Sequence, residues 1–315
     1  ASEILVKGKY SEKILSTLFP ENAETSRVSL VRIACHTHEF VEALHAFKFL
    51  DSQGYRVAFN LMQVSECDSK ELILLAKEAM KYPFDVLYFA DSLGNMNSEK
   101  VQNVIELLRT HWKGALGIHA HDNTGLGLSN TVYALNRGIS WVDSTVTGMG
   151  RGAGNVKTEL LAIEMSKLRD SICNMKPIMV LIANSFKPMK EKYGWGTNPF
   201  YYLSGINSVH PTYVQEMMAD TRYNEEDIIA VIEHLGKDGR KKYSKNILGE
   251  VLNYYTKKPY GNWSPVKLFE GKEVILIGSG PGASVHKKAI ELFIKDSKPL
   301  VMALNAQSVI DNDLI

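Results

Sequence analysis

The sequence has few of the features that mark secreted, membrane-spanning or nucleic-acid-binding proteins. Its 315 residues include three cysteines, Cys35, Cys67 and Cys173, and no CxxC pair, so no disulfide framework is predicted. Lys and Arg (36) balance Asp and Glu (35), which leaves little net charge to attract nucleic acid or a membrane surface. No apolar run reaches the roughly 18 residues that cross a bilayer, and no signal peptide opens the chain. We therefore expect a cytoplasmic protein with no nucleic-acid partner and no membrane partner.

The size and composition of the chain are those of an ordinary globular protein. Hydrophobic residues make up 45% and charged residues 23%, and this length predicts one large or two moderate domains. The chain begins Ala1-Ser2-Glu3 without an initiator methionine, and it ends just after a strand-like run. We expect it to be a fragment of a longer protein.

The first half of the chain alternates between apolar runs and amphipathic segments. Strands are expected at 28–34, 55–62, 85–90, 115–121 and 140–146, and helices at 37–51, 68–81, 98–110, 126–136 and 157–168. This alternation predicts an α/β fold with a parallel sheet covered by helices. The layout is either a doubly wound open sheet or a β/α barrel, and in both the chemistry lies at the carboxyl ends of the strands.

Two histidines end the fourth expected strand. His119 and His121 are two residues apart, so on a strand both side chains project from one face. Two neutral imidazoles on one face can share a divalent metal ion. An isolated HxH pair is more often two satisfied polar residues at a loop entrance, but the residues that follow the other strands favour the metal site here.

Those residues are polar as well. His36 follows the first strand, where it is either a polar lid residue or a proton carrier, and Asp91 and Ser92 follow the third. Four glycines at 148–154 follow the fifth strand and lead to Asn155. Glycines let a backbone approach a ligand closely, and an amide oxygen is a ligand for a hard divalent ion. Asp143, on the fifth strand, is a candidate to contact His119 or His121 from behind.

The second half of the chain changes character twice. Residues 170–260 predict a helical extension, with helices at 172–186, 211–218 and 228–235. Residues 261–315 restart an α/β pattern, in which Gly278, Gly280 and Gly282 separate a strand at 273–277 from a helix at 285–295. That order begins a nucleotide-binding unit, although GxGxG alone is a weak signal. The predicted domains are 1–169, a partial barrel, 170–260, the helical extension, and 261–315, the start of a Rossmann-like domain.

Four motifs, taken with their order and spacing, resemble the DRE-TIM metallolyase superfamily of HMG-CoA lyase-like and 4-hydroxy-2-oxovalerate aldolase-like enzymes. They are VRIACH (31–36), YFADSLGNM (88–96), GIHAHDNTGLGLSN (117–130) and VDSTVTGMGRGAGN (142–155). The resemblance runs from about Val28 to Met165. It implies a TIM (β/α)8-type barrel, represented here by roughly its last five β/α units.

The resemblance also implies roles for single residues. His119 and His121 match two histidine ligands of Mn²⁺ or Mg²⁺, Asn155 matches an asparagine ligand of the lyase branch, and Ser92, beside Asp91, matches a residue that holds the substrate carboxylate. The implied reaction is retro-aldol cleavage of a small-molecule 2-oxo acid, a 4-hydroxy-2-oxo acid, to pyruvate and an aldehyde, or the reaction of a related acyl lyase. The metal ion polarises the carbonyl, and a base removes the hydroxyl proton. A homo-oligomer is expected by analogy.

The chain departs from the family pattern at its start. The DxTLRDG-like motif, which gives the family an aspartate ligand and an adjacent arginine, is absent, and the first three strands are expected upstream of Ala1. Two alternatives stay open. One is a condensing enzyme similar to 2-isopropylmalate synthase, which the histidine motif cannot distinguish from an aldolase. The other is a non-catalytic barrel scaffold fused to a nucleotide-binding or transferase domain.

Overall fold

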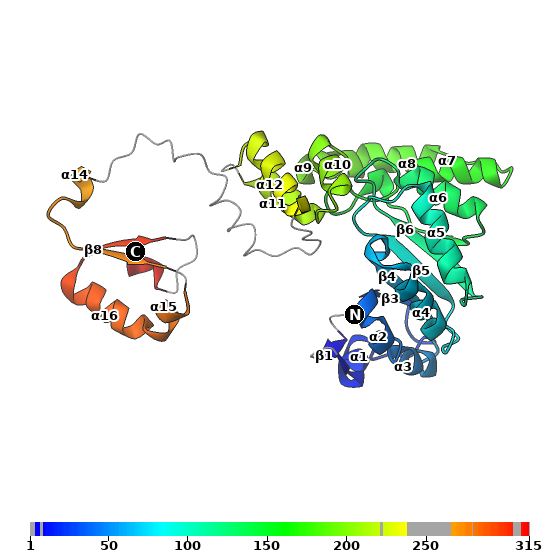
Figure 1. Ribbon diagram of the computed structural model, residues 1–315, viewed down its shortest axis with the longest axis horizontal. Helices are drawn as coiled ribbons and strands as arrows, with labels where there is room; N and C mark the ends of the chain where they lie inside the picture. Colours follow the sequence, from blue (N-terminus) through cyan, green and yellow to red (C-terminus); the bar gives the residue numbers. More distant parts are fainter. Residues whose placement is uncertain are drawn as a thin grey trace. The chain divides into compact units, whose positions relative to one another are not determined.

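Five parallel strands form the centre of residues 1–256, one of the two units into which the chain divides; the other is 257–315 (Figure 1). The computed structural model describes residues 4–6, 9–220, 223–237, 266–278, 280–304 and 310–314. The strands follow one another across the sheet in sequence order: β3 (Leu30–His36), β4 (Arg56–Met62), β5 (Val86–Asp91), β6 (Ala115–Ala120) and β7 (Trp141–Val142). Because all five are parallel, their carboxyl ends lie at one end of the sheet.

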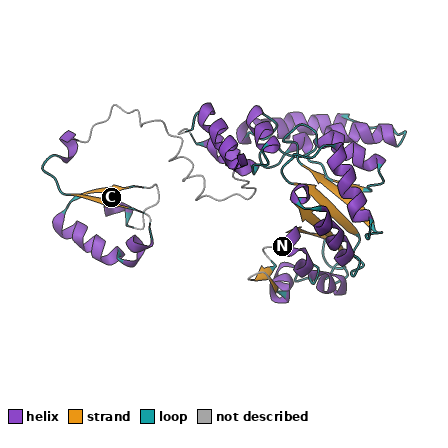
Figure 2. Cartoon of the chain, in the orientation of Figure 1, coloured by secondary structure: helices purple, strands orange, loops and turns teal. Residues whose placement is uncertain are grey.

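Helices follow each strand and cover the outer face of the sheet (Figure 2). They are η1 (Thr37–Glu39), α2 (Phe40–Ala43) and α3 (Ala46–Ser52) after β3, η2 (Val64–Glu66) and α4 (Ser69–Ala79) after β4, α5 (Ser98–Arg109) after β5, α6 (Gly127–Asn136) after β6, and η3 (Val146–Gly148) and α7 (Thr158–Leu168) after β7. Phe59, Phe89 and Leu116 point from the strands into this layer and are fully buried. Each aromatic or branched side chain removed from water here contributes roughly 1.5–3 kcal/mol to stability.

The inner face of the sheet is strongly curved. A flat sheet would separate β3 from β7 by about 19 Å, since neighbouring strands lie roughly 4.8 Å apart. Nevertheless Arg32 Nη1 on β3 lies 2.6 Å from Asp143 Oδ2, directly after β7. The Arg32 guanidinium also lies over the Tyr88 ring, at 4.5 Å from its centroid. The expected α/β fold, with its barrel-type parallel sheet, is confirmed.

Residues 170–237 are helical wherever the structure assigns them regular secondary structure. The elements are α8 (Lys176–Leu181), the π-helical turn η4 (Ile182–Phe186), α9 (Lys187–Tyr193), α10 (Pro199–Ile206), α11 (Pro211–Ala219) and α12 (Glu225–Lys237). The sequence patterns do not predict α9 and α10. Asn198 caps α10 by accepting a hydrogen bond from Tyr201 N at 2.9 Å, a local signal for a helix start. Helices α10 to α12 share a core that includes Tyr213, Met217 and Ala153, the last from the glycine loop after β7.

The remaining elements are small. A β1–β2 pair (Leu5–Val6 and Lys9–Tyr10) and α1 (Glu12–Leu18) precede β3. In residues 257–315, β8 (Val274–Ile277) pairs in parallel with β9 (Leu300–Ala303), and the other elements are α14 (Val266–Phe269), α15 (Pro281–Val285), α16 (Lys287–Ser297) and η5 (Asn312–Leu314). The expected boundary near residue 260 lies outside the described residues. Among the helices that are described, none has the length and apolar character needed to span a bilayer.

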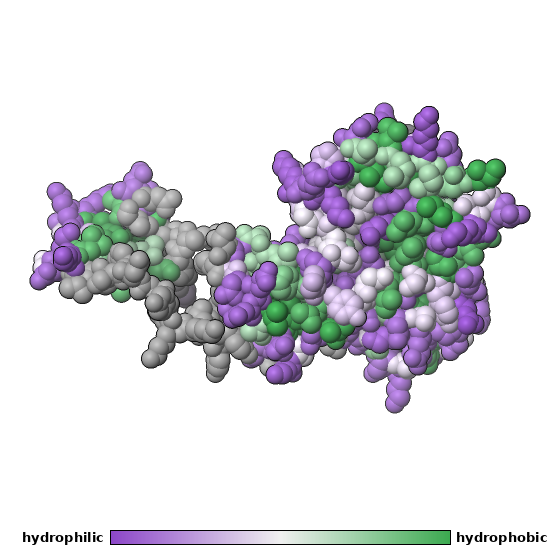
Figure 3. Space-filling view, turned by 90° about the horizontal axis from the view of Figure 1, so that it is seen from above, coloured by the Kyte–Doolittle hydropathy of each residue, from purple (hydrophilic) through white to green (hydrophobic). Residues whose placement is uncertain are grey.

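Apolar side chains are exposed on α7 and α8. The larger ones are Leu160, Ile163, Leu168, Met179, Val180 and Leu181. Figure 3 shows one face of the molecule, on which apolar patches lie among hydrophilic ones. Exposed apolar area of this kind is common on protein surfaces and identifies no partner by itself, so the homo-oligomer stays a prediction.

Candidate functional site

A cavity of about 530 Å³ opens at the carboxyl ends of the strands, on the inner face of the sheet. Its polar lining consists of Arg32, His36, Asn60, Gln63, Ser92, His119, His121, Arg151 and His210. Four of the predicted site residues therefore meet around one space. Another cavity, of about 670 Å³, lies between residues 123–125 and the start of α10, and no predicted site residue lines it.

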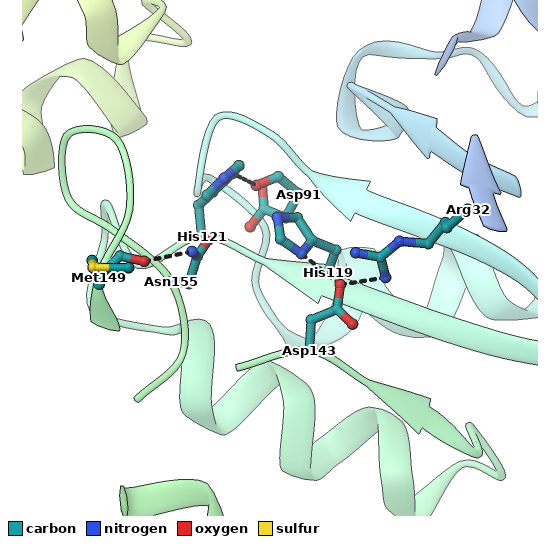
Figure 4. A network of polar contacts seen from close by, with 7 residues as sticks. All are labelled: Arg32, Asp91, His119, His121, Asp143, Met149 and Asn155. Carbon is teal, nitrogen blue, oxygen red and sulfur yellow. Dashed lines mark hydrogen bonds and ion pairs between the residues drawn. The ribbon is translucent and has the colours of Figure 1, made fainter. Parts of the chain in front are cut away.

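His119 is held from behind by a carboxylate. Its Nδ1 lies 2.8 Å from Asp143 Oδ2, and the same oxygen accepts a hydrogen bond from Arg32 (Figure 4). Burial alone would raise the pKa of Asp143, but the hydrogen bond from His119 and the charge of Arg32 outweigh burial and lower it. The ionised carboxylate can only accept, so His119 carries its proton on Nδ1. The lone pair is then on Nε2, the arrangement found in metal-binding histidines.

His121 is held in the same sense by the backbone. Its Nδ1 lies 2.9 Å from the carbonyl oxygen of Asp91 (Figure 4). A carbonyl oxygen only accepts, so Nδ1 is again the donor and Nε2 has the lone pair. Burial, helped by the charge on neighbouring His119, lowers the pKa of His121 to about 4. The ring is therefore neutral at pH 7, as a metal ligand must be.

The glycine loop after β7 folds back onto the end of β6. His121 and Asn155 form an isolated antiparallel bridge, and Asp122 N donates to Gly154 O at 3.0 Å. Gly154 has a φ of +80°, and a Cβ at this position would collide with the carbonyl oxygen of Gly148. Only glycine combines this backbone conformation with such a close approach. The loop thereby brings Asn155 beside the histidine pair.

The side chain of Asn155 presents a buried oxygen that no described residue satisfies. Its Nδ2 donates to Met149 O at 3.1 Å (Figure 4), whereas Oδ1 is buried and has no hydrogen-bond partner among the described residues. Leaving such an oxygen unpaired costs about 1–3 kcal/mol, so the position suits a donor or a cation that the chain itself does not supply. Two imidazole nitrogens and one amide oxygen fit a divalent ion such as Mn²⁺ or Mg²⁺. In the described part of the chain, no three His, Cys, Asp or Glu side chains converge as a metal site.

Asp91 and Ser92 face different surroundings. The Asp91 carboxylate accepts hydrogen bonds from Asn95 N and Met96 N, both at 3.0 Å, and burial raises the pKa of Asp91 to about 6 against these bonds. It thus shapes the loop after β5 and is not one of the described cavity-lining residues. Ser92 lines the cavity, and its Oγ accepts from Gln63 N at 2.9 Å. The Ser92 hydroxyl proton remains available to a ligand.

His36 lines the cavity from the end of β3. Its ring stacks on His38, with centroids 5.5 Å apart, and its backbone N donates to Glu39 Oε2 at 2.9 Å. The structure therefore brings His36 together with Ser92 and the histidine pair in one space, while the roles of these residues stay predictions.

Sequence reasoning assigned no site role to five polar residues that line the cavity: Arg32, Asn60, Gln63, Arg151 and His210. Strand periodicity could have found the first, because Arg32 is four residues before His36 on β3 and shares its face. Asn60 occupies the corresponding face of β4. Arg151 stood within a recognised loop without an assigned role. His210 precedes α11 in the helical segment, and no local signal links it to the sheet.

The predicted nucleotide loop lies in residues 257–315. The helix that follows it, α15, has five residues. A Cβ built on Gly278, Gly280 or Gly282 would meet no atom within 4 Å, and Ser279 lies outside the described residues. Nothing in the described part of this loop requires glycine, and its nucleotide binding stays a prediction.

Comparison with known proteins finds relatives of the barrel half of the chain. A family model described as HMGL-like matches residues 24–181. The 4-hydroxy-2-oxovalerate aldolase of Carboxydothermus hydrogenoformans is 33% identical over 148 residues, which are 47% of this chain and 44% of the relative. That of Chloroflexus aurantiacus is 34% identical over 141 residues, 45% of this chain and 41% of the relative. The chain thus spans less than half the length of these curated relatives.

Solved structures that are similar to this chain include an aldolase domain and a carboxylase. The N-terminal domain of a putative aldolase from Bacteroides vulgatus is similar with a TM-score of 0.57 and 34% identity, over 62% of this chain and 65% of that one. Rhizobium etli pyruvate carboxylase has a TM-score of 0.56 at 15% identity, over 72% of this chain and 25% of that one. At that identity the second likeness concerns the fold alone.

Proposed function

The chain belongs to the HMGL-like family, and from this premise we propose that its cavity is part of the active site of a metal-dependent aldolase. The reaction is cleavage of a 4-hydroxy-2-oxo acid to pyruvate and an aldehyde. One observation carries the proposal: His119 and His121 line one cavity and both have Nδ1 bound to an acceptor, which leaves both Nε2 lone pairs for a ligand. Asn155, whose backbone bridges to His121, adds a buried amide oxygen that has no hydrogen-bond partner among the described residues.

His119, His121 and Asn155 would hold the divalent ion, Mn²⁺ or Mg²⁺. When bound, such an ion supplies Lewis-acid polarisation of the 2-oxo carbonyl. The chain's own contribution is orientation. Asp143 fixes the ring of His119 and raises the basicity of its Nε2, Arg32 fixes Asp143, and the Asp91 carbonyl does the same for His121.

Ser92 and His36 are the two residues that bind and react with the organic substrate in this proposal. The Ser92 hydroxyl, whose acceptor side is occupied by Gln63 N, donates to the substrate carboxylate. His36 takes the proton from the 4-hydroxyl group as the C3–C4 bond breaks. The electrons of the O–H bond form the aldehyde carbonyl, and those of the C3–C4 bond pass to the 2-oxo acid fragment, which takes up a proton to become pyruvate.

The test is release of pyruvate from 4-hydroxy-2-oxopentanoate, followed with lactate dehydrogenase. It should use the longest gene product that contains these residues, treated with chelator and then supplied with Mn²⁺. We expect pyruvate only after metal is added, and a loss of about 10²-fold or more in kcat for His36→Ala. His38→Ala is the matched control, because His38 stacks on His36 but does not line the cavity. If the metal-loaded protein cleaves no 4-hydroxy-2-oxo acid, the aldolase proposal is wrong and the condensing-enzyme and scaffold alternatives remain.

A further inference from the structure

The cavity holds one positive charge that the described residues do not balance. Arg32 is paired with Asp143. Arg151 also lines the cavity, but the structure gives its guanidinium no hydrogen bond and no ion pair to any described residue. None of the described lining residues is an aspartate or a glutamate. An arginine left this way in a cavity is suited to an anionic ligand, because its planar guanidinium matches the oxygens of a carboxylate or phosphate group.

The backbone around Arg151 is held in place. Gly154 N donates to the Arg151 carbonyl oxygen at 3.1 Å, and Gly196 N donates to Gly152 O at 3.1 Å. A Cβ on Gly152 would lie 3.1 Å from the Tyr201 ring, so α10 packs closely against this loop. The helical segment therefore holds the backbone that carries Arg151, and the exposed Arg151 side chain reaches the cavity from this fixed point.

The order of the strands places Arg151 and Ser92 on opposite sides of the histidine pair. Ser92 directly follows β5, His119 and His121 lie at the end of β6, and Arg151 is in the loop after β7. Neighbouring strands are roughly 4.8 Å apart. A ligand that reaches from Ser92 past the histidines to Arg151 is therefore longer than pyruvate, and a cavity of about 530 Å³ has room for one.

A further buried group marks the same space as a ligand site. Asn60 is 5% exposed and lines the cavity, and its Oδ1 is buried without a hydrogen-bond partner among the described residues. Buried amide oxygens are rarely left unsatisfied, so a hydrogen-bond donor is expected from a ligand here. A hydroxyl group on the ligand would supply it.

We propose that the substrate carries a second anionic group, a carboxylate or a phosphate, at the end remote from its 2-oxo acid, and that Arg151 binds this group. The inference rests on the proposed function, because it assumes that the 2-oxo acid end lies at Ser92. It makes Arg151 a residue that determines specificity and gives the helical segment a part in the site.

The experiment compares dissociation constants by calorimetry in the Mn²⁺-loaded longest gene product. The probes are 2-oxopentanoate, 2-oxoglutarate, which has a carboxylate in place of the terminal methyl group of the same five-carbon chain, and 2-oxo-4-phosphonooxybutanoate. We expect the carboxylate or the phosphate probe to bind about 10- to 100-fold more tightly than 2-oxopentanoate. The free energy of a hydrogen bond to a charged group corresponds to this ratio of dissociation constants. The probe whose affinity exceeds that of 2-oxopentanoate by the larger factor shows whether the anionic group is a carboxylate or a phosphate.

Variants assign the preference to Arg151. In Arg151→Gln the dissociation constant of 2-oxopentanoate and that of the preferred anionic probe should become about equal. Arg151→Lys, which keeps the charge but not the planar group, should retain part of the preference. Arg137→Gln is the matched control, because Arg137 lies over the Tyr133 ring and does not line the cavity. It should leave the ratio unchanged.

Three results would overturn the inference, and they differ in what they say of the proposed function. If 2-oxopentanoate binds and neither the carboxylate probe nor the phosphate probe is preferred, or if Arg151→Gln keeps the preference, the inference is wrong and the aldolase proposal stands. If no 2-oxo acid binds to the metal-loaded protein, the proposed function is wrong and this inference falls with it.

Discussion

Two glycine-rich loops in this chain, residues 148–155 and 278–284, look alike in sequence and differ in structure. In the first, Gly154 has a φ of +80° and faces the Gly148 carbonyl, and a Cβ on Gly150 would lie 2.7 Å from Asn155 Nδ2. In the second, Gly280 has an ordinary φ of −69° and no atom near the place of a Cβ. Glycine at every second position is the same sequence signal in both loops. What distinguishes a built site is that each glycine is required by a particular neighbour.

The largest difference that we expect between the two loops is in how an alanine substitution changes the free energy of unfolding. Gly154→Ala adds a methyl group where the φ is positive and the Gly148 carbonyl occupies the space, and we expect it to lower the free energy of unfolding by about 3 kcal/mol. Gly280→Ala should change it by less than about 0.5 kcal/mol. Urea unfolding followed by circular dichroism measures both. Equal effects of the two substitutions would show that the structural difference between the loops does not contribute to the free energy of unfolding.

A second effect concerns the support behind His119. Asp143→Asn removes the carboxylate that orients the ring, and we expect metal affinity to fall about 10- to 100-fold. The matched control is Asp85→Asn, because Asp85 also pairs with an arginine, Arg56 at 2.7 Å, but at the amino ends of the strands. Titration with Mn²⁺ gives both affinities. Unchanged affinity in Asp143→Asn would mean that this carboxylate has no role in the site.

The smallest effect is on the pH dependence of stability. Burial, together with the charges of Arg151 and His36, lowers the pKa of His210 to about 4, below its value in the unfolded chain. The unfolded state therefore takes up the proton more readily, and stability is lost as the pH falls from about 6.5 toward 4. Between pH 7 and pH 5 this loss is about 1–2 kcal/mol.

The variant His210→Asn should reduce the wild-type loss by this amount, as seen in urea unfolding at the two pH values. His121, whose pKa burial also lowers to about 4, keeps its own contribution. His286→Asn is the control in the region of the second loop, where His286 is exposed, and it should leave the pH dependence as it is. If the wild-type slope persists in His210→Asn, the burial of His210 is not the cause of the loss.

The regular elements near the site could be predicted from the sequence, and the short strand β7 could not. Strand β5 is expected at 85–90 and found at Val86–Asp91, because its apolar run is distinct from the helices on either side. Strand β7 is expected at 140–146 and ends at Val142. From Thr145 the chain pairs with the far side of the glycine loop instead, with Thr145 N donating to Val156 O at 2.9 Å. That pairing depends on how the loop closes.

The polar network of the site shows the same limit. The HxH pair and Asn155 can be recognised from strand periodicity and motif. The Arg32–Asp143 ion pair joins residues 111 positions apart and exists only because the sheet curves, which no local pattern encodes. His210 likewise reaches the cavity from a helical segment whose packing on the barrel the sequence predicts only in outline.

The most direct test of the account is the metal content of the protein. The longest gene product should be loaded with Mn²⁺, dialysed and measured by elemental analysis, beside His119→Ala/His121→Ala and a control in which His45 and His286, both exposed, are replaced by alanine. We expect about one ion per chain in the wild type and the control, and close to none in the His119/His121 variant. Absence of bound metal in the wild type, or metal that stays after loss of both histidines, would contradict this expectation.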